Sequence, residues 1–230
     1  MKRRRVIGIL AAWLLAQPAG LAAEITFCPT LGSRVRASVE SLLERRWKHV
    51  IRQGLDISCG SAALATILHY QFGSRVSEDA LIRAILKNVK PEEVKKRGGF
   101  SLLDLKQVAG TLGYHVQGYK MTMENLRALR MPALVPIKLR GTKHFVVYRG
   151  MVGDRVVLAD PSFGNTLLEE DRFAAIWERI ALVVVKDGHR RTRSQLDVAQ
   201  DDLPIAEDPE ALSSFLRPTS VHTVVRPDEF

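Results

Sequence analysis

Cys59 is the residue of this 230-residue sequence that is best placed for nucleophilic chemistry. It begins an apolar helical segment that ends at Gly73, and Ser58 precedes it as a candidate N-cap. A thiol in the first turn of a helix lies at the positive end of the dipole, beside unpaired backbone N–H groups, and both features favour the thiolate. Gln53 lies upstream and can offer its side-chain amide to an oxyanion. The alternative is a buried structural cysteine on a core helix.

His144 and Asp160 supply the other half of a nucleophilic site. His144 opens a Val-rich segment after a short turn, and Asp160 ends the next such segment, directly before Pro161. Two antiparallel strands joined by a tight turn place the start of one beside the end of the other, so the imidazole and the carboxylate can touch. Taken singly, each residue has a simpler interpretation, as a polar strand end and as part of a turn.

These four residues predict a thiol hydrolase. Cys59 is the expected nucleophile, His144 the base that activates it and later protonates the leaving amine, and Asp160 the group that orients the imidazole. Gln53 and the Cys59 backbone N–H are the expected oxyanion donors. A zinc site is the competing interpretation, but no CxxC or HExxH pair provides its usual spacing. We therefore expect no metal and no cofactor.

The segments that position these residues are helical first and extended afterwards. Apolar spacing predicts helices over 33–51, 59–72, 77–86 and 101–112, whereas the charged stretch 87–99 is expected to be a surface loop. From Tyr114 the period becomes two, and the sequence predicts strands at 114–118, 133–139, 144–149, 155–159 and 180–186, with short helices over 122–129 and 171–177. We expect an α+β domain, with N-terminal helices packed on an antiparallel sheet.

The first 23 residues are predicted to be a secretory signal peptide. Basic residues 2–5 precede an apolar run at 6–16 and a small-residue region at 18–23, with cleavage expected after Ala22 or Ala23. The apolar run of about eleven residues is too short to span a bilayer, which needs about twenty. We expect a periplasmic protein, and the alternative is anchorage in the inner membrane by an uncleaved signal.

Composition excludes some classes of partner. An apolar share of 46% is ordinary for a globular protein with a hydrophobic core. The net charge is +9, and the four basic residues of the signal account for part of it, leaving 9 − 4 = +5. Arg and Lys do not alternate with aromatic residues as in a nucleic-acid-binding surface, so we expect no nucleic-acid partner and no integral membrane domain.

An exported protein with two cysteines raises the question of a disulfide. A bond between Cys28 and Cys59 is one alternative, and it would block the proposed nucleophile. Phe27 makes the residues before Cys28 a poor lipidation motif, because a small residue is expected there. We interpret Cys28 as an incidental thiol near the N-terminus.

Taken together, the motifs resemble a known family. They are Gln-x5-Cys-Gly-x-Ala-x-Leu from Gln53, Leu-x2-Val-Ala-x2-Leu-Gly from Leu105, His-Phe-Val-Val from His144, Ala-Asp-Pro ending at Pro161, and then Gly164 and Trp177. In this order they resemble the double-glycine leader peptidases, papain-like cysteine peptidases of family thirty-nine that process bacteriocin precursors. The resemblance runs from about Ile51 to Lys186, roughly 60% of the chain.

The resemblance implies a papain-like peptidase domain over 51–187 with Cys59, His144, Asp160 and Gln53 as its catalytic residues. It implies an exported endopeptidase that cleaves after small residues in a secreted precursor, of a bacteriocin or of a surface fibre such as functional amyloid. A secretion-system component is a further implied partner. The family usually has Asp where this chain has Ser58, and many relatives are fused to a transporter, whereas this chain looks free-standing.

Three further expectations complete the interpretation. Residues 24–50 form an N-terminal amphipathic helical segment, and 188–230 form a poorly ordered tail, since this stretch is rich in proline and charge. The small residues from Gly60 to Ala63 suggest a narrow cleft floor that admits only small substrate residues. Two alternative functions stay open: a catalytically silent module that binds leader peptides, and acyl transfer on the same scaffold.

Overall fold

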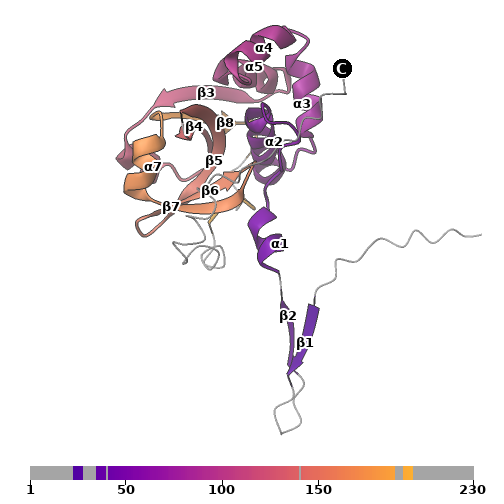
Figure 1. The fold of residues 1–230 in the computed structure, drawn as a ribbon, viewed down its shortest axis with the longest axis vertical. Helices are drawn as coiled ribbons and strands as arrows, with labels where there is room; N and C mark the ends of the chain where they lie inside the picture. Colours follow the sequence, from indigo (N-terminus) through magenta and orange to yellow (C-terminus); the bar gives the residue numbers. More distant parts are fainter. Residues whose placement is uncertain (1–22, 28–34, 40, 140, 190–193, 199–230) are drawn as a thin grey trace, which may run out of the picture. The chain divides into compact units, whose positions relative to one another are not determined.

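The computed structural model describes residues 23–27, 35–39, 41–139, 141–189 and 194–198 (Figure 1). The chain divides into two units, Met1–Ser41 and Leu42–Phe230. The signal region 1–22 and Cys28 lie outside the described residues. Within the described part, none of the helices combines the length and apolar character needed to cross a membrane.

The first unit contains a pair of antiparallel strands, β1 (Ala23–Phe27) and β2 (Val35–Val39). The predicted helix over 33–51 is therefore wrong for 35–39, and the helical segment over 24–50 is wrong for 24–27 as well as for 35–39. Apolar residues alternate with polar ones in Val-Arg-Ala-Ser-Val, which is the period of a strand. The helix itself is confined to α1 (Leu42–Trp47), which belongs to the second unit.

The second unit is built on a six-stranded antiparallel sheet, as the period-two segments predict. Its strands are β3 (His115–Lys120), β4 (Ala133–Leu139), β5 (Thr142–Val152), β6 (Arg155–Asp160), β7 (Gly164–Glu169) and β8 (Ile180–Val185), in the order β3-β8-β4-β5-β6-β7. The sequence analysis did not predict β7. That strand is short, and it is specified by its pairing with β6, in which Gly164 lies opposite Asp160.

Four helices gather on one side of this sheet (Figure 1): α2 (Cys59–Phe72), α3 (Glu78–Ile85), α4 (Pro91–Arg97) and α5 (Leu102–Thr111). The α+β prediction is confirmed, but the expected surface loop over 87–99 is wrong, because α4 occupies most of it. Pro91 starts this helix, and Val94 is the residue it buries. Its acidic first turn and basic last turn suit the helix dipole, so a charge pattern typical of a loop also fits a short helix.

Side chains of alternating direction give the sheet two apolar faces. Leu134, Val147 and Ala159 pack with α2 and α5 in one core. Val135, Val146 and Leu158 face the other way and are covered by α6 (Met123–Ala128) and α7 (Glu170–Ile176). Helix α2 is buried over eleven of its 14 residues, so its position against the sheet is tightly constrained.

Residues 194–198 return to this core after the last strand. Leu196 is completely buried within the cluster that also contains Cys59. The buried Arg149 donates from Nε to the Leu196 carbonyl oxygen at 3.0 Å and from Nη2 to that of Asp197 at 3.3 Å. The expectation of a poorly ordered tail from 188 is therefore wrong for 194–198, and residues 199–230 lie outside the described part.

We predict that Leu196→Ala lowers the free energy of unfolding by about 2 kcal/mol or more, because it leaves a cavity in the core. Denaturant unfolding followed by fluorescence measures this loss. Leu103→Ala is the matched control, since Leu103 is 60% exposed on α5 and its truncation should cost less than about 0.5 kcal/mol. Equal effects of the two substitutions would contradict the packing of 194–198.

Candidate active site

Cys59 is the first residue of α2 and is 8% exposed. It carries a free thiol. The structure corrects one expectation about its neighbour, because the Ser58 side chain makes no capping bond to the helix. The Ser58 hydroxyl lies 2.7 Å from the Leu55 carbonyl oxygen and also contacts the Glu78 carboxylate, two acceptors that compete for its single hydrogen. A capping bond would use the N–H of the second or third helical residue, so the Cys59 backbone N–H, at the first position, suits an oxyanion donor with or without a cap.

Glu78 is a residue of the site that the sequence analysis missed. It follows Ser77 at the start of the predicted helix over 77–86, and it lies in the first turn of α3. Its carboxylate also accepts the Gly54 N–H at 3.0 and 3.1 Å, in addition to its bond with Ser58. Glu78 thus holds both ends of the loop that leads from Gln53 into Cys59.

Gln53 lies on this loop with its amide held at two points. Its Nε2 donates to the Leu55 carbonyl oxygen at 3.0 Å, and its Oε1 accepts from the Ser162 hydroxyl at 2.7 Å. An amide NH2 group has two N–H bonds, and the described residues supply an acceptor for one of them. The second is available for a substrate oxygen.

His144 and Asp160 make the contact that the strand connection predicts. Strands β5 and β6 are neighbours, and His144 Nε2 lies 2.9 Å from Asp160 Oδ1. Their side chains are 12% and 5% exposed. Cys59 lies close enough to the ring to contribute to the raised pKa of His144. Because Nε2 faces Asp160, Nδ1 is the ring nitrogen that remains to serve the thiol.

The surroundings of His144 make its imidazole ring strongly basic. Burial alone lowers its pKa, but the hydrogen bonds and charges of Asp160 and Cys59 outweigh burial and raise the pKa from 6.5 to about 10. The imidazolium is therefore the stable form at neutral pH. A protonated ring beside the sulfur can donate a proton to the leaving group of a nucleophilic reaction.

The loop after Asp160 is fixed from two directions. Asp160 Oδ1 accepts the backbone N–H groups of Ser162 at 2.7 Å and Phe163 at 3.2 Å. From outside, Arg46 of α1 donates its Nε to the Phe163 carbonyl oxygen at 2.6 Å. Gly164 has φ +82°, and a Cβ there would lie 2.3 Å from the Arg46 carbonyl oxygen, so the loop can pack on α1 with glycine alone at this position.

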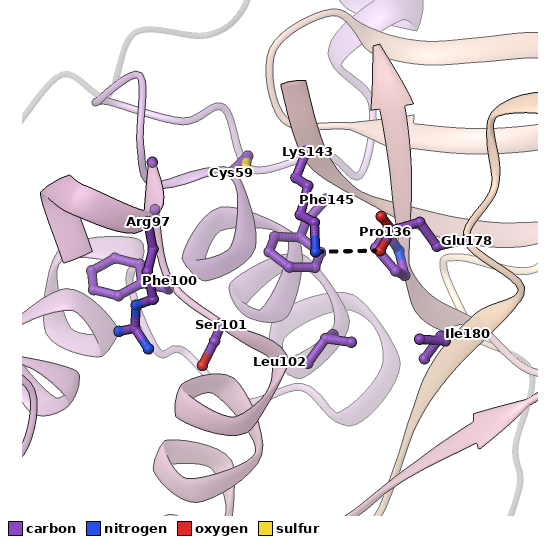
Figure 2. Close-up of a pocket in the computed structure, with 12 residues that line it drawn as sticks. Cys59, Arg97, Phe100, Ser101, Leu102, Pro136, Lys143, Phe145, Glu178 and Ile180 are labelled. Atoms are coloured by element: carbon purple, nitrogen blue, oxygen red, sulfur yellow. Dashed lines mark ion pairs between the residues drawn. The ribbon is translucent and has the colours of Figure 1, made fainter. Parts of the chain in front are cut away.

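A pocket of about 360 Å³ opens beside Cys59 (Figure 2). Its walls come from the 97–102 segment on one side and from the sheet on the other, with Phe100, Leu102, Phe145 and Ile180 as apolar contributors. The ion pair between Lys143 Nζ and Glu178, at 3.8 Å, adds charge to the wall (Figure 2). Such a mixed lining suits an extended peptide with apolar side chains.

The predicted cleft floor is wrong in its residues. Ser61, Ala62 and Ala63 are completely buried within α2 and do not line this pocket. Their small size serves close packing, as the preceding residue shows: a Cβ at Gly60 would lie 3.0 Å from a methyl group of Leu105 and 3.1 Å from the Phe145 ring. The cleft next to the thiol is instead flanked by Phe100 and Phe145.

The raised pKa of His144 makes a signed prediction about stability. The unfolded-state pKa is near 6.5 and the folded-state pKa near 10, so the imidazolium stabilises the fold fully below pH 6.5 and loses this effect as pH rises towards 10. Unfolding free energies of the wild type and Asp160→Asn, measured from pH 6 to 10, should therefore differ by a few kcal/mol at the acidic end and converge at the alkaline end. A difference that stays constant across this range would contradict the pairing.

With this geometry established, comparisons with known proteins place the chain. Residues 47–188 match the Peptidase C39 family. The chain is 37% identical over 185 residues to the probable functional amyloid protease FapD of Pseudomonas aeruginosa, covering 80% of this chain and 81% of that protein. The protein of the same name from Pseudomonas fluorescens is 37% identical over 166 residues, which cover 72% of this chain and 73% of that one.

A solved structure shares the fold. The peptidase domain of Streptococcus ComA, a bi-functional ABC transporter involved in a quorum-sensing pathway, superposes with a TM-score of 0.52 at 23% identity, covering 60% of this chain and 98% of that domain. The helices and antiparallel sheet are thus those of a papain-like C39 peptidase domain. A family match over more than half of the chain, together with relatives that align along most of both sequences, shows that this chain belongs to the peptidase C39 family.

Proposed function

We propose that this chain is a cysteine endopeptidase that cleaves a secreted precursor after small residues. The observation that carries the proposal is the His144–Asp160 hydrogen bond, with Cys59 close enough to act on the pKa of the ring and a partly apolar pocket beside the sulfur. A thiol, an imidazole and a carboxylate close together are the parts of a nucleophilic acyl-transfer site. Membership of a peptidase family supports peptide-bond hydrolysis as its reaction.

In the proposed mechanism, the Cys59 sulfur attacks the scissile carbonyl carbon as a thiolate. The carbonyl oxygen gains charge and is stabilised by the Cys59 backbone N–H and the Gln53 amide. His144 then gives its Nδ1 proton to the leaving nitrogen, and the C–N bond breaks. Water, deprotonated by the same imidazole, hydrolyses the thioester and restores the thiol. Asp160 keeps Nε2 protonated and the ring oriented throughout.

The substrate class is the finer part of the proposal. Two relatives are named probable functional amyloid proteases, which supports a precursor belonging to a surface-fibre secretion system, with a bacteriocin precursor as the alternative. A secretion-system component is a further proposed partner. The apolar pocket wall supports recognition of apolar residues in the precursor. Export to the periplasm remains a prediction from the sequence, because residues 1–22 lie outside the described part.

A catalytically silent module that binds leader peptides is the second candidate. The free thiol close to a protonated imidazole counts against it, because a binding module has no need of an activated sulfur. Rapid, His144-dependent alkylation of Cys59 by iodoacetamide supports the enzyme, and alkylation as slow as that of free cysteine supports the module.

We predict that Cys59→Ala and His144→Ala each reduce precursor cleavage about 10³-fold or more, because each removes a group that no neighbour replaces. Cleavage is measured by mass spectrometry with purified protein, and thermal unfolding checks that the fold survives. His115→Ala is the control. His115 lies at the start of β3, is largely exposed and is paired with Asp187. Unchanged turnover by Cys59→Ala protein would exclude the proposed chemistry.

We also predict that Leu-Leu in place of a Gly-Gly pair before the scissile bond lowers kcat/KM at least tenfold. Phe100 and Phe145 flank the pocket at Cys59, and bulky substrate residues would keep the carbonyl beyond attack distance. The measurement compares two otherwise identical peptides, and a third with substitutions downstream of the bond is the control. Equal cleavage of the Gly-Gly and Leu-Leu peptides would show that the site accepts large residues.

A further inference from the structure

The two halves of the site come from distant parts of the chain. Gln53 precedes α2 on the helical side, whereas the Asp160 carboxylate ends a strand of the sheet. The residue that contacts both is Ser162. Its backbone N–H donates to Asp160 Oδ1 at 2.7 Å, and its hydroxyl donates to Gln53 Oε1 at 2.7 Å.

The direction of the second bond follows from chemistry. A hydroxyl can donate or accept, so its contact with an amide does not by itself say which amide atom faces it. The Leu55 carbonyl oxygen can only accept, and it lies 3.0 Å from the Gln53 nitrogen. The NH2 group is therefore on the side of Leu55, and the atom that faces Ser162 is the amide oxygen. Ser162 must donate.

This donation sets the orientation of the amide. The last torsion of a glutamine side chain is broad, so the amide turns freely unless its two ends are held. Leu55 holds the nitrogen and Ser162 holds the oxygen. A backbone bond from Gln53 N to the Pro161 carbonyl oxygen, at 3.0 Å, keeps the two loops together.

The hydroxyl is presented from a loop that is itself fixed. Asp160 accepts two successive backbone N–H groups at its start, and Arg46 Nε donates to the Phe163 carbonyl oxygen from α1. The substitution Ser162→Ala keeps the backbone bond to Asp160 and removes only the bond to Gln53. One substitution can therefore separate the two contacts of this residue.

We propose that Ser162 is a positioning residue that fixes the Gln53 amide as an oxyanion donor and acts on catalysis through Gln53, not through His144. This inference rests on the proposed peptidase function. The expected effect of losing the hydroxyl is selective. It slows reactions that build charge on a carbonyl oxygen, and it leaves the reactivity of the thiolate unchanged.

The test measures two reactions of Cys59 in the same set of variants. Cleavage of a synthetic peptide with an apolar leader before Gly-Gly gives kcat and KM, and alkylation by iodoacetamide gives the reactivity of the sulfur without an oxyanion. We expect Ser162→Ala to lower kcat about five- to twentyfold, the loss of one hydrogen bond, with KM unchanged. Its alkylation rate should stay within about twofold of wild type.

Three further variants make the result specific. Ser162→Thr keeps the hydroxyl and should retain kcat within about threefold of wild type. In a Gln53→Ala background, Ser162→Ala should change kcat by less than about twofold, because the group it positions is gone. Ser74→Ala changes a serine just beyond the C-terminal end of α2, the end opposite Cys59, and should behave as wild type. Thermal unfolding of every variant checks folding.

Several outcomes would overturn the inference. An equal loss of alkylation and cleavage in Ser162→Ala would place the effect on Asp160 and His144. If Ser162→Ala lowered kcat as much in the Gln53→Ala background as in the wild type, Ser162 would act independently of Gln53. A Ser162→Ala variant with wild-type kcat would show that the hydroxyl has no role in catalysis. A wild-type chain that is alkylated but cleaves no peptide with a small-residue pair would remove the proposed function, and this inference with it.

Discussion

The hydrogen bond between His144 Nε2 and Asp160 Oδ1 is the interaction on which the arrangement of the site depends. It joins two neighbouring antiparallel strands at the edge where helix α2 begins. Because it uses one ring nitrogen, it presents the other to Cys59, and it supplies the negative charge that a buried imidazolium needs. Without it, the ring would lose the bond and the charge of Asp160, which oppose the lowering of its pKa by burial.

The helical side of the site is set by close packing and by one carboxylate. Gly60 lets the start of α2 approach Leu105 and the Phe145 ring, which leaves no space for a larger residue. Glu78 then fastens the preceding loop through Gly54 and Ser58. The carboxylate that holds this loop therefore comes from another helix, α3.

Segments outside residues 47–188 take part in the same structure. Asn165, at the start of β7, donates its amide to the backbone oxygens of Arg45 and Lys48, at 3.1 and 2.8 Å, and accepts from Arg149 Nη1 at 2.9 Å. Arg149 in turn holds the carbonyl groups of the 194–198 segment. The two ends of the domain therefore meet beside the strand that carries the Asp160 loop, which extends the peptidase core in both directions.

Local patterns in the sequence determined most of the elements and pointed to Cys59 as the proposed nucleophile. Helix periodicity, caps and strand alternation depend on neighbouring residues, so α2, α3, α5 and five strands were predictable, as was the contact of His144 with Asp160 across one tight turn. Tertiary structure decided the rest. The Gln53–Ser162 bond joins residues 109 positions apart, and Glu78 and Leu196 act through contacts that no local pattern encodes. Such contacts form after the chain has packed, because their partners are brought together by the whole fold and not by adjacent sequence.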